Sequence, residues 1–119
     1  MGLFHVKGQL TGPTGRAEEV ELLVDTGATL TVLPRPLAER LELKAARSQR
    51  VVIAGGQRDV WSVAEVRLGL NGDETTTPCF IAPDGPPLLG AVALESLFLA
   101  VDPVGKRLIP VEGLLVNYP

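Results

Sequence analysis

One aspartate lies at a position where a charge is costly. Within residues 22–34, Asp25-Thr26-Gly27 stands between two apolar runs. A carboxylate is rarely buried without a partner, because removing its water is costly, so Asp25 needs a partner or a chemical role. Thr26 can donate and accept a hydrogen bond, and Gly27 allows a sharp turn that brings an N–H near the carboxylate. The pattern fits either a catalytic acid or an Asp that caps its own loop.

The elements around this turn are predicted to be mostly short strands. Residues 22–24 lead into the acid and residues 30–33 lead away from it, and both runs have strand character. Residues 4–10 and 18–24 are separated by turn-forming residues and predict a hairpin. Further strands are predicted over residues 51–53, 60–63, 66–70, 75–82, 107–111 and 113–119.

Two short helices complete the prediction. Pro36 suits the first position of a helix over residues 36–43, which places Leu37, Ala38 and Leu41 on one packing face. Residues 91–97 are also helix-like. Between the strands at 51–53 and 60–63, the glycines of the tip predict a long hairpin, either a flap that closes over a peptide or an ordinary surface hairpin.

Three segments in one order resemble those of a known family. They are Asp25-Thr26-Gly27-Ala28, the glycine-tipped Ala54-Gly55-Gly56, and Pro87-Leu88-Leu89-Gly90 followed by the helix-like segment. Together they resemble the retroviral-type (retropepsin-like) aspartic proteases, and more closely the small stand-alone cellular members. The resemblance runs from about residue 3 to residue 111. It implies a mainly β, closed-barrel-like acid protease fold with one or two short helices, equivalent to half of a pepsin-like two-lobe site.

The number of acids then predicts the assembly. A chain of 119 residues makes one domain, over residues 1–119, and is too short for two lobes. It has a single D-T-G, whereas this chemistry needs two facing carboxylates, so a homodimer is expected in which the two Asp25 residues meet at a two-fold axis. Two such carboxylates roughly 3 Å apart share one proton, as is known for aspartic proteases. The pair activates a water that attacks a peptide carbonyl, and neither metal nor cofactor is required.

The resemblance also implies supporting roles. Thr26 would hydrogen-bond across the axis, the Gly27 N–H would orient the carboxylate, and Ala28 completes the catalytic loop. Leu88, Leu89 and Gly90 would pack beside that loop. Candidate flap residues are Ala54, Gly55, Gly56 and Trp61, and candidates for apolar substrate pockets are Val32, Ile53, Trp61 and Leu89.

The chain departs from the viral pattern at the dimer contacts. Retroviral enzymes commonly carry an acid after D-T-G-A and an Arg after the second glycine, whereas Thr29-Leu30 and Ala91 stand here. Retroviral relatives also pair their chain ends in a dimer sheet, which points to Leu114-Leu115-Val116. The strength of the dimer and its detailed contacts are therefore open.

Other chemical candidates are weaker. His5 lies in a strand-like segment without an obvious acid partner, so a surface or interface role is expected. Cys79, between Pro78 and Phe80, is expected to be a buried small apolar residue. With one cysteine and one histidine, a zinc site is not expected.

Composition limits partners and location. The net charge is −3 and the 11 basic residues are scattered, so no nucleic-acid surface is expected. Arg47, Arg50 and Arg58 fit either a groove or solvated surface charge. The sequence has no long apolar span and no signal-like start, which predicts a soluble, cytoplasmic protein without membrane contact.

Three functions remain at this point. The first is an aspartic endopeptidase that acts on a peptide or protein substrate. The second is a non-catalytic peptide-binding or scaffold domain that keeps the protease fold. The third is a phosphate-handling enzyme, because residues 25–29 also fit the D-x-G-x-T loop of actin-like kinases. The length argues against the third, since that fold needs two large lobes.

Overall fold

Strands dominate the computed structural model, which describes residues 4–119. The strands in this part of the chain are β1 (His5–Thr11), β2 (Ala17–Val24), β3 (Thr31–Pro34), β4 (Arg47–Val52), β5 (Arg58–Leu70), β6 (Asp73–Ala82), β7 (Leu88–Leu89), β8 (Leu99–Asp102) and β9 (Arg107–Pro110). Two short α-helices, α1 (Arg35–Arg40) and α2 (Ala91–Ser96), and a 3-10 turn, η1 (Ala54–Gly56), accompany them.

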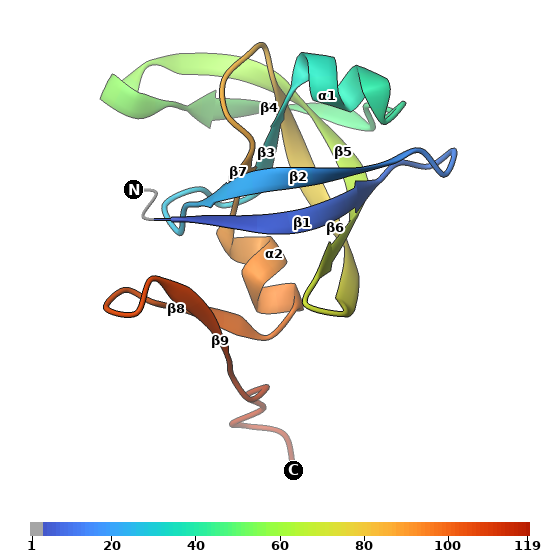
Figure 1. Cartoon of the computed structure of the whole chain (residues 1–119). Helices are drawn as coiled ribbons and strands as arrows, with labels where there is room; N and C mark the ends of the chain where they lie inside the picture. Colours follow the sequence, from blue (N-terminus) through green and yellow to red (C-terminus); the bar gives the residue numbers. More distant parts are fainter. Residues whose placement is uncertain (1–3) are drawn as a thin grey trace.

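The main sheet closes on itself. Its strand order is β1-β2-β7-β3-β6-β5-β4, and β1 also pairs with β5. Six strands therefore form a ring, and β4 extends from the ring as the partner of β5 (Figure 1). This arrangement confirms the predicted mainly β, closed-barrel-like fold with two short helices.

Leucines fill the interior of the ring. The largest fully buried side chains are mostly leucines on β1, β2, β3, β5 and β7 and at the end of α1, namely Leu10, Leu22, Leu33, Leu41, Leu68 and Leu89. Burying each such side chain contributes roughly 1.5–3 kcal/mol of transfer free energy. The ring is thus a packed core, and any site must lie at its surface or beside its loops.

The longest strand corrects the sequence analysis. Residues 60–63 and 66–70 were expected as separate strands, but β5 runs without interruption over 13 residues. Alternation explains the continuity: Ala64, Val66, Leu68 and Leu70 are buried, while Glu65 between them is exposed. β5 pairs in turn with β4, β6 and β1, so one strand joins the β4–β5 hairpin to the body of the molecule.

Helix α1 is shorter than predicted. The expected helix over residues 36–43 ends at Arg40, because Leu41 is its C-cap and Glu42 has a positive φ of 57°. Leu37 and Ala38 are buried as predicted. Arg40 also ties the helix to β2, donating to both carboxylate oxygens of Glu18 at 2.8 and 3.2 Å. No helix among residues 4–119 has the length and apolar character needed to cross a membrane.

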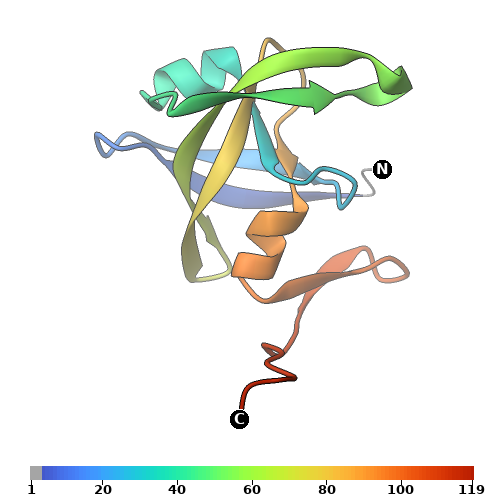
Figure 2. The ribbon, with the colours of Figure 1, turned by 180° about the vertical axis from the view of Figure 1, so that it is seen from behind.

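The C-terminal part differs most from prediction. β9 agrees with the strand predicted over residues 107–111, but its partner β8 was not predicted. The strand predicted over residues 113–119 is wrong for the single chain: this segment is irregular and exposed. Figure 2 shows it leading away from the β8–β9 hairpin, where no strand lies beside it. Leu114, Leu115 and Val116 are each at least 75% exposed.

Candidate active site

The loop after β2 holds the carboxylate of Asp25 in place through its own backbone. The Gly27 N–H donates to Asp25 Oδ1 at 2.9 Å, and the Ala28 N–H donates to the Asp25 carbonyl at 3.2 Å. The Asp25 N–H in turn donates to the Leu89 carbonyl at 3.0 Å. A carboxylate that accepts a backbone N–H is fixed in orientation as well as position. The first of these bonds is the one that the resemblance implied for Gly27.

A second segment, far away in sequence, braces this loop. β7 lies parallel to the end of β2, with Leu89 opposite Val24, so Gly90 arrives next to the acid. The Ala91 N–H donates to Ala28 O at 2.8 Å, and the Val92 N–H donates to Thr29 O at 3.0 Å. The predicted packing of this segment beside the Asp25 loop is therefore present.

Gly90 fits this junction because it has no side chain. A Cβ at this position would lie 2.4 Å from both the carbonyl carbon and the oxygen of Leu30. Such a distance is far below van der Waals contact, and the neighbouring atoms are backbone that cannot rotate away. Close approach of two backbones, and not an unusual φ, is the reason for glycine here.

The sequence analysis missed Thr31. Its side chain is completely buried, and its hydroxyl accepts a hydrogen bond from the Gly90 N–H at 3.2 Å. Thr31 thereby satisfies a backbone donor at the junction of the two segments. The available signal was a hydroxyl residue inside the apolar run that follows the turn, since a buried polar group usually has a hydrogen-bonding purpose.

The tip of the turn is at the surface. Val24 and Thr31 on either side are 2% and 0% exposed, as the apolar runs predict. Asp25 itself is half-buried, and Thr26 and Gly27 are exposed. The expectation of a turn within buried backbone is thus correct for its flanks and wrong for its tip. The single chain presents this tip to solvent or to a partner.

An apolar cavity of about 350 Å³ adjoins Asp25. Its wall includes the side chains Leu30, Val32, Val51, Ile53, Trp61, Phe80 and Leu88. Three of the four predicted pocket residues, Val32, Ile53 and Trp61, are among these. The prediction for Leu89 is wrong, because this side chain is completely buried in the core. Successive residues of a strand point to opposite faces, so Leu88 lines the cavity and Leu89 does not.

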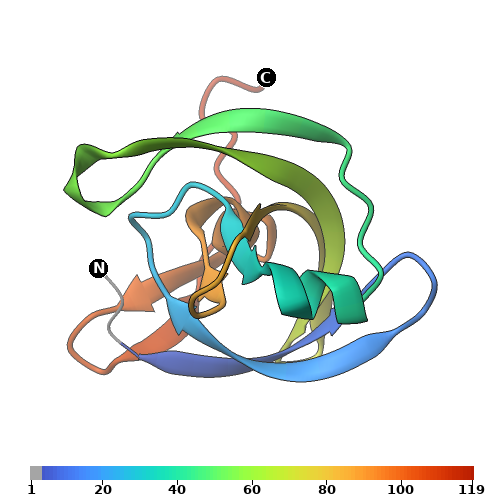
Figure 3. The same cartoon turned by 90° about the horizontal axis from the view of Figure 1, so that it is seen from above.

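The β4–β5 hairpin forms one side of this cavity. Its tip is η1, where Gly55 and Gly56 have φ values of 85° and 79°, and Ala54 lines the cavity. Seen from above, the tip and the Asp25 loop lie on the same side of the molecule (Figure 3). Of the predicted flap residues, Ala54 and Trp61 line the cavity, while Gly55 and Gly56 make the turn.

Trp61 is held in the cavity wall. Its indole N–H donates to Asp59 Oδ2 at 3.0 Å, and its ring meets Phe80 edge-on with centroids 6.2 Å apart. Edge-to-face packing of this kind restrains both rings. Contacts within the chain therefore hold this part of the cavity wall, formed by β5 and β6.

The remaining chemical candidates lie elsewhere. Cys79 is completely buried, and burial raises the pKa of its thiol to about 12, which agrees with the predicted apolar role. His5 is exposed on β1. Among residues 4–119, no three His, Cys, Asp or Glu side chains are grouped so as to hold a metal ion.

Comparison with known proteins gives matches of two kinds. The model of the aspartyl protease family matches residues 6–93. EIAV protease, solved in complex with the inhibitor HBY-793, is similar in structure with a TM-score of 0.63 and 19% identity, over 88% of this chain and 90% of that one. The protease of simian foamy virus (mac) gives a TM-score of 0.57 and 16% identity, over 78% and 93% of the two chains.

The two kinds of match carry different weight. At these identities the structural likeness establishes the retroviral-protease fold alone, and no curated protein sequence matches the chain. The family match covers most of the chain, including the Asp25 loop and the β7 segment that braces it. It leaves no basis for the phosphate-loop interpretation of residues 25–29. The chain belongs to the aspartyl protease family.

Proposed function

We propose that this protein is an aspartic endopeptidase that works as a homodimer, with residues 1–119 as one protease domain and Asp25 of each subunit in a shared site. One observation carries the proposal. Asp25 lies on a loop held by its own backbone and by a distant segment, at the edge of an apolar cavity that has a hairpin on one side. A binding domain has no need for a carboxylate in that position.

The chemistry requires two carboxylates that share a proton. The ionised member takes a proton from a water, which attacks the scissile carbonyl, while the protonated member donates a hydrogen bond to the carbonyl oxygen. The protonated member later helps to protonate the leaving amine. The dyad titrates as a unit and not as two independent acids. The Gly27 N–H donates to Asp25 Oδ1 and so restricts the orientation of this carboxylate.

The surface around Asp25 supports a two-fold arrangement. Thr26 and Gly27 are exposed at the tip of the loop, and an axis beside this tip sets the two loops against each other. Thr26 then hydrogen-bonds to the partner loop. In Figures 1, 2 and 3 the flap tip lies on this same side, so two flaps would cover one shared cleft.

The substrate follows from the cavity wall. Its aliphatic and aromatic side chains favour a peptide with an apolar residue next to the scissile bond. The cytoplasmic location predicted from the sequence is part of this proposal, and the free thiol of Cys79 is compatible with a reducing compartment.

The test is cleavage of a diverse peptide library between about pH 4 and pH 7, which spans carboxylate titration. Three proteins are compared at high concentration: the unmodified chain, Asp25→Asn, and Asp84→Asn as a matched control in an exposed loop. We expect Asp25→Asn to lose cleavage by about 10²-fold or more, with unchanged circular dichroism. Asp84→Asn should remain active. Full activity of Asp25→Asn would refute the mechanism.

Mixing the chains tests the shared site. Adding excess Asp25→Asn to a fixed amount of unmodified chain should lower the activity per unmodified chain, because mixed dimers have one carboxylate. Activity that is independent of the variant would instead indicate a site within one chain. If a dimeric unmodified protein cuts no peptide yet binds peptides, the non-catalytic binding function replaces this proposal.

A further inference from the structure

A second groove adjoins the cavity beside Asp25. It has a volume of about 490 Å³ and shares four residues with that cavity, namely Leu30, Val51, Val52 and Phe80. Its other lining residues are Thr29, Arg47, Gln49, Arg50 and Val63. Because the two spaces share a wall, one extended peptide can occupy both.

The groove has a positive character that the chain as a whole lacks. The net charge of the protein is −3, yet the residues that line this groove include two arginines and no acid. The sequence left open whether Arg47, Arg50 and Arg58 line a groove or are surface charge. Arg47 and Arg50 line it and Arg58 does not.

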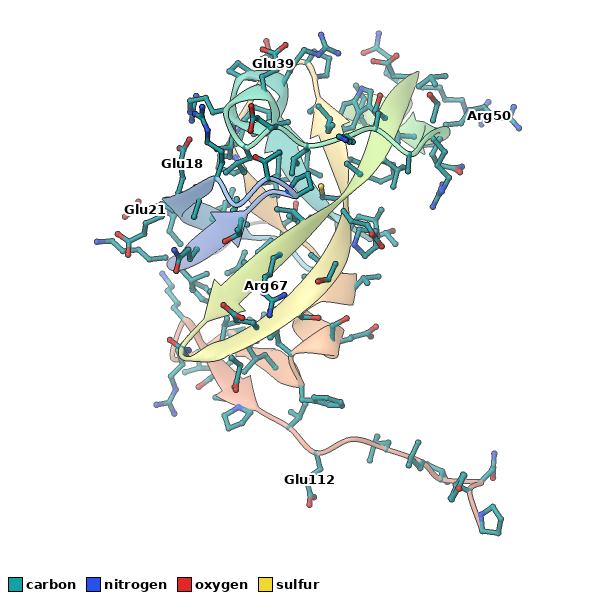
Figure 4. The ribbon with its side chains drawn as sticks, turned by 90° about the vertical axis from the view of Figure 1, so that its right-hand side faces the viewer. Glu18, Glu21, Glu39, Arg50, Arg67 and Glu112 are labelled. Carbon is teal, nitrogen blue, oxygen red and sulfur yellow. The ribbon has the colours of Figure 1, made fainter. Side chains whose placement is uncertain are left out.

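Strand register separates the two arginines. Arg47 lies opposite Val63, and Arg50 lies opposite Val60. Opposite residues of an antiparallel pair share a face. Val63 is 4% exposed and Val60 is 59% exposed, so Arg47 is on the inward face. Arg50 is on the outward face, and Figure 4 shows its side chain extending away from the body of the molecule.

Gln49 shares the inward face with Arg47. One guanidinium nitrogen, Nη1, donates to Gln49 Oε1 at 3.4 Å. A guanidinium has five N–H donors in a planar fork that fits a carboxylate, so this contact positions Arg47 and leaves donors for a ligand.

The geometry points to a subsite for an acidic side chain. We propose that Arg47, oriented by Gln49, binds the carboxylate of a Glu or Asp in the peptide whose apolar residue fills the cavity beside Asp25. This inference rests on the proposed function in one respect: it takes the bound peptide to be a substrate that is cleaved. Binding of an acidic peptide does not depend on cleavage.

The subsite lies away from the scissile bond. Val51 lines both spaces and Arg47 is four residues earlier in β4, which is about 13 Å along a strand that rises ~3.3 Å per residue. An extended peptide covers that distance with about four residues. Because the long side chain of Arg47 can reach toward the peptide, fewer peptide residues are needed to bridge it. The acidic residue is therefore expected roughly two to four positions from the cleaved bond.

The experiment compares peptides that differ only by Glu or Gln at each of these positions. For the unmodified chain, kcat/KM should be about threefold to tenfold higher for Glu at one of them, the range of a partly exposed charge-assisted contact. Added salt should reduce this preference. Arg47→Gln should bring the ratio close to one, while Arg35→Gln, at an exposed residue that does not line the groove, should keep it.

A binding assay separates this proposal from the proposed function. The same peptide pairs, labelled with a fluorophore, are titrated with Asp25→Asn. Tighter binding of Glu peptides without any cleavage by the unmodified chain supports the subsite and rejects the peptidase. Cleavage or binding without a preference for Glu, or an equal loss of that preference in Arg47→Gln and Arg35→Gln, overturns the subsite.

Discussion

The Asp25 loop and the tip of the β4–β5 hairpin, the proposed flap, line the same cavity but are held in different ways. The loop is held by long-range contacts: its backbone bonds to Leu89, Ala91 and Val92, all from a distant part of the chain. At the flap tip, the Ile53 N–H donates to Gln57 O, and the Gly56 N–H donates to Ile53 O, both within the hairpin itself. Local bonds at an exposed tip open at low free-energy cost. The Asp25 loop is thus tied to a distant part of the chain, whereas the hairpin tip is held only by bonds within its own turn.

The glycines of the two regions differ in the same way, since one is surrounded by backbone atoms and the other is in open space. Gly90 at the loop faces backbone atoms that leave no room for a methyl group. Gly55 at the flap has nothing within 4 Å, and only its positive φ favours glycine. Substitutions at the two positions therefore test packing in one region and backbone conformation in the other.

The largest effect is expected for Gly90→Ala. The added methyl group forces the β7 segment away from Leu30 and should lower the free energy of unfolding by about 3 kcal/mol or more. Gly69→Ala is the matched control, because a Cβ there meets its nearest atom at an ordinary 3.6 Å. Urea denaturation measures both variants. Similar stability of the two would mean that the junction relaxes easily and that the loop is not held as described.

A smaller effect is expected for Thr31→Val. This change keeps the shape but removes the hydroxyl that accepts from the Gly90 N–H, and an unpaired buried donor costs about 1–3 kcal/mol. Thr77→Val is its control, since Thr77 is also buried but donates only to its neighbour Pro78 at 3.3 Å. Thermal melts should show the greater loss for Thr31→Val. An equal loss would remove the special role of Thr31 at the junction.

At the flap, activity should change more than stability. Gly55→Ala strains a positive φ and should lower the free energy of unfolding by about 1 kcal/mol. Gly15→Ala is matched to it, with a φ of 95° and open space around it in the β1–β2 turn. Both should melt alike, but only Gly55→Ala should lower kcat/KM. An equal kcat/KM in the two variants would show that the conformation of the tip does not matter for turnover.

The smallest effect is expected away from both regions, at the pair of Glu18 and Arg40. The hydrogen bond from Arg40 lowers the pKa of the Glu18 carboxyl. A lowered pKa in the folded state stabilises the protein above the ordinary glutamate pKa, and this gain is lost as the pH falls through the folded value. Glu18→Gln should therefore be slightly less stable than the unmodified chain at neutral pH and equal to it in acid. Melts of both proteins across the pH range measure this convergence, and a stability difference that stays constant with pH would contradict it.

Local patterns predicted the parts of the fold whose causes are local. The D-T-G turn, the hairpin of β1 and β2, and the glycine-tipped hairpin of β4 and β5 each follow from residues within a short window. The alternation of apolar and polar residues along β5 also indicated one continuous strand. The charged Glu65 in its middle led to the prediction of two separate strands.

Other features depend on partners distant in sequence. The role of Thr31 requires Gly90 beside it, and the choice between Leu88 and Leu89 for the cavity requires the register of β7 on β2. The apolar residues 114–116 predict a strand by composition, yet a strand needs a neighbour to pair with. Within the described chain none lies beside them.

The bond between Gly90 and Thr31 also bears on when the site forms. Its two residues are 59 positions apart, and β7 lies parallel to β2, a pairing that a tight turn cannot make. Contacts of such long sequence separation form slowly during folding. Asp25 is made early in synthesis, but the segment that braces it comes from the last third of the chain. The order of synthesis thus delays the bracing of the Asp25 loop, so that a growing chain carries the acid before the geometry around it is fixed.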